Sequence, residues 1–217
     1  MCTVVVRSDP FFLLSNRDEF LERPAAALDF WPDQPILAGR DLRSGGAWLG
    51  FGAHGRWAVL TNLPGVPPPA PPTRGRLVQD FLMGGLSPQE YALGVQRQDF
   101  AGFNLLVGAP GQLVYVSTQS PPRVLGPGLQ VLGNTPIEQS SERTDRALQL
   151  VEQSGTESVE EQLDLFRDPL VWIDLGLYGT RCTTLARVTG GDLTVWERTR
   201  GQATAVRRDW PGWLQKE

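Results

Sequence analysis

Two short apolar runs near the amino terminus predict a strand hairpin. Residues 2–7 are mostly β-branched and residues 11–15 are Phe-Phe-Leu-Leu-Ser, so each run is typical of a buried strand. Ser8-Asp9-Pro10 between them predicts a turn that makes the two strands antiparallel. The second run ends in a polar cluster, Asn-Arg-Asp-Glu at 16–19. Because the outer ends of a hairpin lie side by side, we expect Cys2 next to this cluster.

The same alternation of apolar runs and turn residues recurs along the chain. It predicts further hairpins at 45–62, 102–118 and 180–198, with one more strand near 130–134. The expected total is about nine strands.

Two proline-rich segments interrupt this pattern. Residues 23–37 contain three prolines, which are incompatible with a regular helix or a central strand. We expect a covering loop there, anchored to the core by Phe30 and Trp31. Residues 64–72 contain six prolines and predict a stiff, exposed spacer, with a ligand for a proline-binding partner as the alternative.

Four segments show helical signals. In Gly75–Met83 the apolar residues recur at the spacing of one buried helix face. Capping-box sequences at Ser87–Glu90 and Ser158–Glu161 predict the starts of two more helices. Residues 141–154 have helical spacing and stop before Gly155.

Hairpins with helices grouped between them favour antiparallel sheet with helices packed on it, rather than alternating strand–helix units. The chain has 217 residues and is 41% hydrophobic, enough for one sizeable core. We therefore predict an α+β fold with mostly antiparallel sheets, in a single domain over residues 1–217.

Charge and composition argue against several functions. A formal net charge of −4 gives no basic surface for nucleic acid or an anionic membrane. No apolar run approaches the roughly 18 residues of a membrane span, and the signal-peptide layout is missing, so we expect a cytoplasmic protein. Two cysteines make neither a zinc site nor a disulfide framework, and no metal is expected. The single histidine, His54, lies in a Gly-rich turn and is expected to be solvated.

Cys2 differs from an internal cysteine, because removal of Met1 would leave a free α-amine and a thiol on one residue. An α-amine titrates near ~7.7–8.0 and a thiol near ~8.5, so the two groups can exchange a proton near neutral pH without a histidine. A neighbouring cation, Arg17 or Arg181, is expected to lower the pKa of the thiol.

Other polar residues could complete such a site. Asp18 could orient the amine, and Asn62 or Asn134 could donate to a developing oxyanion. Less specific interpretations stay open: Cys2 as a small buried hydrophobe, and the cluster 16–19 as a solvated turn with an Arg–carboxylate pair. Cys182 lies in an apolar strand and is expected to be buried, unpaired core.

Several motifs taken together resemble one family. They are Met1-Cys2, Ser-Asn-Arg-Asp-Glu-Phe at 15–20, Ala-Gly-Arg-Asp-Leu at 38–42, Gly-Gly-Ala-Trp-Leu-Gly at 45–50, Leu-Thr-Asn at 60–62, Gly-Phe-Asn-Leu-Leu-Val-Gly at 102–108 and Tyr-Gly-Thr-Arg at 178–181. On these motifs the chain is similar to the NRDE family, the family of the transport and Golgi organisation 2 protein.

The resemblance implies a fold and a site. The family is similar to the cysteine-type N-terminal nucleophile hydrolases, which fold as a four-layer αββα sandwich. In those enzymes the amino-terminal cysteine is the nucleophile in amide hydrolysis, which points to Cys2. The matching motifs add the candidates Arg17, Asp18, Asn62, Asn134 and Arg181. The hydrolases usually show Arg-Asn, one residue, then Asp, whereas this chain reads Asn16-Arg17-Asp18.

The resemblance also implies a second class of function. The family has been linked to lipid and acyl-coenzyme A homeostasis and to haem trafficking, so a non-catalytic binder or carrier of haem or an acyl-coenzyme A-like ligand is the alternative to an amide or thioester hydrolase or acyltransferase. Axial ligands for haem are scarce: His54, two cysteines, Met1 and Met83. Charge for an anionic ligand could come from five arginines: Arg17, Arg40, Arg43, Arg74 and Arg76.

Overall fold

A computed structural model describes residues 2–155 and 158–215. The chain forms two compact units. The first comprises Met1–Arg23 and Pro127–Gly212, and the second comprises Pro24–Gly126 and Trp213–Glu217.

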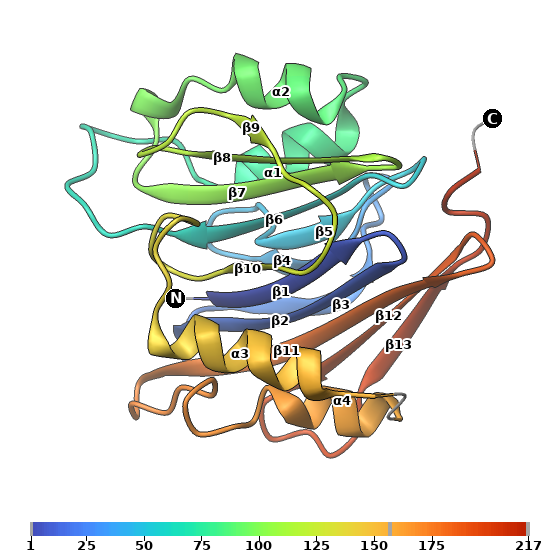
Figure 1. The fold of residues 1–217 in the computed structure, drawn as a ribbon. Helices are drawn as coiled ribbons and strands as arrows, with labels where there is room; N and C mark the ends of the chain where they lie inside the picture. The colour runs from blue at the N-terminus through green and yellow to red at the C-terminus, as the bar shows by residue number, and fades with distance from the viewer. Residues whose placement is uncertain (1, 156–157, 216–217) are drawn as a thin grey trace. The chain divides into compact units, whose positions relative to one another are not determined.

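The first unit is built on an antiparallel sheet with the strand order β10-β1-β2-β11-β12-β13. Its strands are β1 (Cys2–Ser8), β2 (Phe11–Phe20), β10 (Gln130–Leu132), β11 (Tyr178–Thr189), β12 (Asp192–Thr199) and β13 (Val206–Trp210). Two helices, α3 (Glu142–Gln153) and α4 (Val159–Leu165), cover one face of this sheet (Figure 1).

The alternation of side chains along β2 explains how this sheet holds its helices. Phe12 and Leu14 point to the helix-covered face, where they pack with Ala147 of α3 and Leu163 of α4. Successive strand residues point to opposite faces, so Asn16 and Asp18 follow on the helix-covered face, and Arg17 lies on the other.

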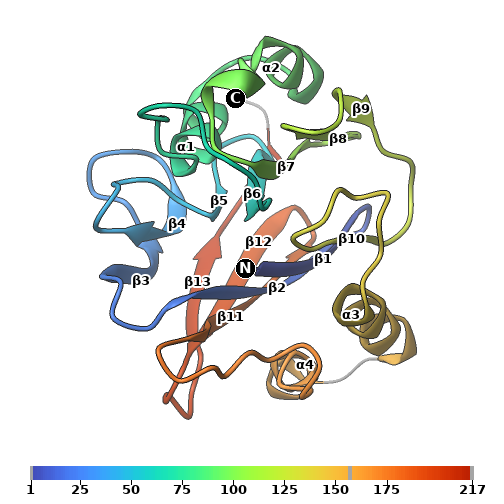
Figure 2. The same cartoon turned by 90° about the vertical axis from the view of Figure 1, so that its left-hand side faces the viewer.

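The second unit is built on a seven-stranded antiparallel sheet with the order β3-β4-β5-β6-β7-β8-β9. Its strands are β3 (Ala25–Phe30), β4 (Leu37–Asp41), β5 (Leu49–Phe51), β6 (Trp57–Asn62), β7 (Phe103–Ala109), β8 (Gln112–Ser117) and β9 (Arg123–Val124). The helices α1 (Gly75–Met83) and α2 (Pro88–Gly94) pack on it (Figure 2), followed by a 3₁₀ turn at Arg97–Asp99.

The local helix signals are confirmed. The helix α1 has the predicted bounds, and its buried residues are Leu77, Val78, Phe81 and Leu82. Reciprocal capping-box hydrogen bonds form at Ser87 and Ser158, because each serine hydroxyl accepts from the backbone three residues on and the glutamate there returns a bond. The predicted α+β class with antiparallel sheets is therefore confirmed, whereas the single domain over residues 1–217 stays a prediction.

Three expectations about strands are wrong. The strand β2 does not stop at Ser15 but continues to Phe20, because Phe20, Glu19 and Asp18 pair with β11. The segment 23–37 contains the edge strand β3, which its prolines allow because they lie outside the strand. Trp31 is buried as expected, but Phe30 is 43% exposed. In the part of the chain that the structure describes, the strands number thirteen rather than nine.

The core of the first unit should tolerate truncation poorly. Leu14 is fully buried, so Leu14→Ala leaves a cavity and should lower the free energy of unfolding by about 2–5 kcal/mol. Leu93→Ala is the matched control, because that side chain is 65% exposed and its loss should change stability by no more than about 0.5 kcal/mol. Urea unfolding of both variants tests the assignment, and equal losses would contradict it.

Candidate functional site

Cys2 is the first residue of β1 and lies opposite Arg17 of β2, which in turn lies opposite Cys182 of β11. Residues directly opposite in paired strands point to the same face, so the Arg17 side chain shares its face of the sheet with both thiols. All three residues are buried. The sequence-based expectation that Cys2 lies beside the cluster 16–19 is confirmed.

Asn16 points to the other face of the sheet, where its side chain makes structural hydrogen bonds. Its amide nitrogen donates to the Phe166 carbonyl (2.9 Å), and its oxygen accepts from the Thr183 hydroxyl (2.7 Å). Both partners are buried. Asn16 therefore ties β2 to β11 and to the segment after α4, and the cluster 16–19 is no solvated turn.

Asp18 is the most buried charge of the cluster, with a fully buried side chain. Its Oδ1 accepts from the Thr180 hydroxyl (2.6 Å), and its Oδ2 lies 2.6 Å from Nη1 of Arg143 on α3. Arg143 also donates from Nε and Nη2 to the Val171 carbonyl, at 3.0 and 2.6 Å. The Asp18 carboxylate is therefore held from β11 and from α3 at once.

A β-bulge makes this arrangement possible. The pairing of β11 with β2 shifts between Thr180 and Cys182, and Arg181 is the extra residue. Without the shift, Thr180 could not face Asp18 while Cys182 faces Arg17. The guanidinium of Arg181 donates to the carbonyls of Phe20 and Arg23, where the chain leaves β2.

Asn134 reaches the nitrogen of Cys2. It lies in the segment between β10 and α3, and the backbone nitrogen of Cys2 donates to its Oδ1 (3.2 Å). In antiparallel pairing β1 begins opposite Arg17, so Asp18 lies just beyond it, on the side of the Cys2 nitrogen. The first unit thus brings together Cys2, Arg17, Asp18 and Asn134.

Burial decides the protonation of the Cys2 thiol. It raises the pKa of Cys2, and the carboxylate of Asp18 acts in the same direction, whereas a hydrogen bond with the Asp18 backbone and the charge of Arg17 lower it. The net direction is upward. Arg17 lowers this pKa as expected, but the loss of water around the thiol outweighs it.

Cys182 is buried and unpaired, as expected. Burial raises the pKa of its thiol well above the ordinary value, and the charge of Glu197 adds to the rise. Cys2 and Cys182 flank one strand, so their Cα atoms lie about 9–10 Å apart, too far for a disulfide.

The remaining candidates have other surroundings. Asn62 is the last residue of β6 and belongs to the second unit. His54 sits in the turn before β6 with a positive φ of 58° and is exposed, which fits the solvated histidine expected there. Among the arginines considered for an anionic ligand, Arg40 pairs with Asp33 (3.1 Å) and Arg76 with Asp80 (3.1 Å).

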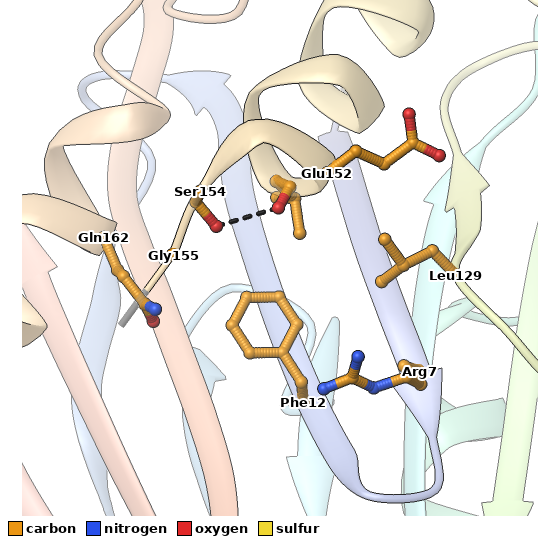
Figure 3. A pocket seen from close by; sticks show the side chains of 8 residues that line it. Arg7, Phe12, Leu129, Glu152, Ser154, Gly155 and Gln162 are labelled. Carbon is orange, nitrogen blue, oxygen red and sulfur yellow. Dashed lines mark hydrogen bonds between the residues drawn. The ribbon is translucent and has the colours of Figure 1, made fainter. Parts of the chain in front are cut away.

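A cavity of about 350 Å³ opens at the other end of the β1–β2 hairpin (Figure 3). Residues that line it include Arg7, Phe12, Leu129, Val151, Ser154 and Gln162. Arg7 lies five residues along β1 from Cys2, a distance of about 17 Å in a strand. This cavity is therefore separate from the surroundings of Cys2.

Arg143 is the site residue that sequence reasoning missed. A signal was present, because Arg143 precedes Ala147 and Val151 at a spacing of four residues and so lies on the buried face of α3. A cation on the apolar face of a helix indicates a buried anionic partner. The sequence does not identify that partner, because Asp18 is far from Arg143 along the chain.

The residues that the structure describes were searched for metal-binding clusters and for membrane-spanning helices. Within 2–155 and 158–215, three or more Cys, His, Asp or Glu side chains nowhere gather in a way that could hold a metal ion. Over the same residues, none of the helices combines the length and apolar character needed to cross a membrane.

The fold has a solved counterpart. The Caenorhabditis elegans N-acylethanolamine-hydrolyzing acid amidase ortholog superposes with a TM-score of 0.57 over 85% of this chain and 92% of its own. The two sequences are 12% identical, so the likeness shows the fold alone. The chain therefore has the N-terminal nucleophile hydrolase fold that the resemblance implied.

Sequence comparison identifies the family. The family model described as transport and Golgi organisation 2 matches residues 1–173. The homologues of transport and Golgi organization protein 2 from Bos taurus and Homo sapiens are each 33% identical over 195 residues, covering 79% of this chain and 69% of theirs. The Mus musculus homologue is 32% identical over the same coverage. The chain belongs to the transport and Golgi organisation 2 family.

The protection of Cys182 can be measured in a Cys2→Ser background, where it is the sole thiol. Because burial raises its pKa, little thiolate exists at neutral pH, and a small alkylating reagent should react at least about tenfold more slowly with the native than with the urea-unfolded protein. The native rate should climb as the pH rises. Equal native and unfolded rates at neutral pH would contradict the assignment.

Proposed function

We propose that this protein acts through Cys2 as an N-terminal nucleophile, in hydrolysis or acyl transfer at an amide or thioester bond of a small molecule. The observation that supports the proposal most is the 3.2 Å contact between the Cys2 nitrogen and Asn134 Oδ1. It holds in place the atom that would become the α-amine once Met1 is removed.

The chemistry needs no group beyond Cys2 and its neighbours. The α-amine takes the proton of the thiol while the Sγ atom forms a bond to the substrate carbonyl carbon. When the resulting oxyanion collapses, the C–N or C–S bond breaks and the ammonium returns the proton to the leaving amine or thiol. Water, or a second amine or thiol, then attacks the acyl-cysteine, and the C–S bond to Cys2 breaks to restore the thiol.

An internal base suits the raised pKa of the Cys2 thiol. A buried thiol is mostly protonated at neutral pH, so it is a weak nucleophile unless a base lies within the same residue. Arg17, opposite Cys2, would stabilise the developing thiolate, and Asp18 would orient the ammonium. The amide group of Asn134, in the same unit as Cys2, is the candidate donor to the oxyanion.

One observation favours the alternative, a non-catalytic binder of haem or an acyl-coenzyme A-like ligand. Cys2 is only 9% exposed, and a buried, protonated thiol is also what a purely structural cysteine shows. A carrier would bind its ligand without any covalent change at Cys2. Spectroscopic titration with haem, and calorimetric titration with an acyl-coenzyme A, would then give saturable binding that Cys2→Ser leaves unchanged.

The enzymatic proposal predicts a processed amino terminus and a single acylation. Intact mass of the native protein should show Met1 absent. A β-lactone or an activated thioester should add once, at Cys2, with a rate that rises through the pKa of the α-amine near ~7.7–8.0 because the neutral amine is the base. Peptide mapping locates the adduct.

The matched control exploits the second thiol. Cys182→Ser should leave the acylation rate within about twofold, because Cys182 is not the nucleophile, whereas Cys2→Ser should abolish the adduct. A native protein that retains Met1, or an adduct that persists in Cys2→Ser, would overturn the proposal.

A further inference from the structure

The most enclosed charge pair described in the first unit joins Asp18, next to the proposed nucleophile, to Arg143, which no motif identified. Arg143 Nη1 and Asp18 Oδ2 are 2.6 Å apart, and their side chains are 17% and 0% exposed. A second pair on the same helix gives a comparison: Arg146 lies 2.7 Å from Asp168, with side chains 33% and 14% exposed. Only the first pair involves a residue next to Cys2.

The Arg143 guanidinium is fixed from two sides. Nε and Nη2 donate to the Val171 carbonyl, which leaves Nη1 for Asp18. Asp18 is fixed by the Thr180 hydroxyl on its other oxygen (2.6 Å), and that hydroxyl in turn accepts from the Ile173 backbone (2.9 Å). One carboxylate oxygen of Asp18 is held by a hydrogen bond and the other by an ion pair, so the side chain cannot turn without losing a buried contact.

We propose that Arg143 is a positioning residue, which balances the charge of Asp18 and sets its carboxylate beside the Cys2 nitrogen so that the α-amine can act as a base. This inference rests on the proposed function. An unbalanced carboxylate beside the amine would favour the protonated ammonium, which cannot accept the thiol proton. With Arg143 in place, the carboxylate can orient the amine without holding it permanently protonated.

Further titratable groups face this site from the neighbouring strands and from α3. From β11, Cys182 lies beyond Arg17 and the Tyr178 hydroxyl donates to the Asp18 carbonyl (3.1 Å). From β12, Glu197 acts on Cys182. From α3, Arg143 reaches Asp18, and from β2 itself Arg17 lies opposite Cys2. Arg143 is the group among these that directly neutralises Asp18.

The test is the pH dependence of Cys2 acylation by a β-lactone in three variants. Arg143→Met leaves the charge of Asp18 unbalanced, and that charge is opposite to the charge of the ammonium. An opposite charge close to a titrating group shifts its pKa by one unit or more, so the pH of half-maximal rate should rise by about one unit. Arg143→Lys restores a cation and should return the midpoint to within a few tenths of a unit of the wild type. Arg146→Met removes the comparison pair on the same helix and should leave the midpoint unchanged.

A purely structural role for Arg143 predicts another pattern, in which Arg143→Met loses stability but keeps the wild-type midpoint. That result, or a midpoint moved equally by Arg146→Met, would overturn the inference. If Arg143→Met does not fold, the double variant Asp18→Asn/Arg143→Met removes both buried charges, and its midpoint should not rise above that of the wild type. A raised midpoint there would contradict the role of Asp18 as the group that Arg143 balances.

Failure of the proposed function has a separate signature. If the wild-type protein is not acylated at Cys2, the proposed function fails, and the inference about Arg143 fails with it. If the wild type is acylated and Arg143→Met matches it at every pH, only the inference is overturned.

Discussion

The surroundings of Cys2 depend on one constraint, the pairing of β2 with a strand on each side. Because β1 and β11 both pair with β2, its side chains must alternate between the two faces of the sheet. Arg17 therefore shares a face with Cys2 and Cys182, while Asn16 and Asp18 point to the helices. A shift of one residue in the pairing of β2 with β11 would separate Asn16 from Thr183 and Asp18 from Thr180.

The same pairing buries the charge of Asp18, and a buried charge has a large desolvation penalty. An exposed ion pair contributes about 0–1 kcal/mol, whereas removal of one partner of a buried pair costs about 3–5 kcal/mol. Asp18 with Arg143 belongs to the second kind, since its carboxylate is fully enclosed. Apolar residues of similar volume often stabilise a core as well or better, so stability is a weak reason for this pair. A functional role for the charge beside Cys2 is a stronger reason for the pair than stability.

The features that were predicted correctly from the sequence are those that depend on residues close together along the chain. The bounds of α1 and the capping boxes at Ser87 and Ser158 follow from periodicity and short motifs, and the β1–β2 hairpin follows from two apolar runs around a turn. The extension of β2 to Phe20 was missed because four polar residues look like a turn unless their distant partner β11 is known. The edge strand β13, with three charged residues in Val206–Trp210, carries no apolar alternation. Cys2 and Asn134 were found by chemistry and motif, but Arg143 needed the structure. The effect of Arg17 on the pKa of Cys2 was predicted correctly, whereas the larger, opposite effect of burial does not show in a local pattern.

If Cys2 acts as its own base, its nitrogen is a titratable amine held by Asn134, and nitrogen NMR of protein labelled with ¹⁵N-cysteine reports on that atom. We expect the Cys2 nitrogen to resonate as an amine, to move with pH through a single titration near ~7.7–8.0, and to change its midpoint in Asn134→Ala. The Cys182 nitrogen, an ordinary backbone amide of β11, serves as the internal reference. A Cys2 nitrogen that resonates as an amide, with no titration across that range, would rule out Cys2 as an N-terminal nucleophile.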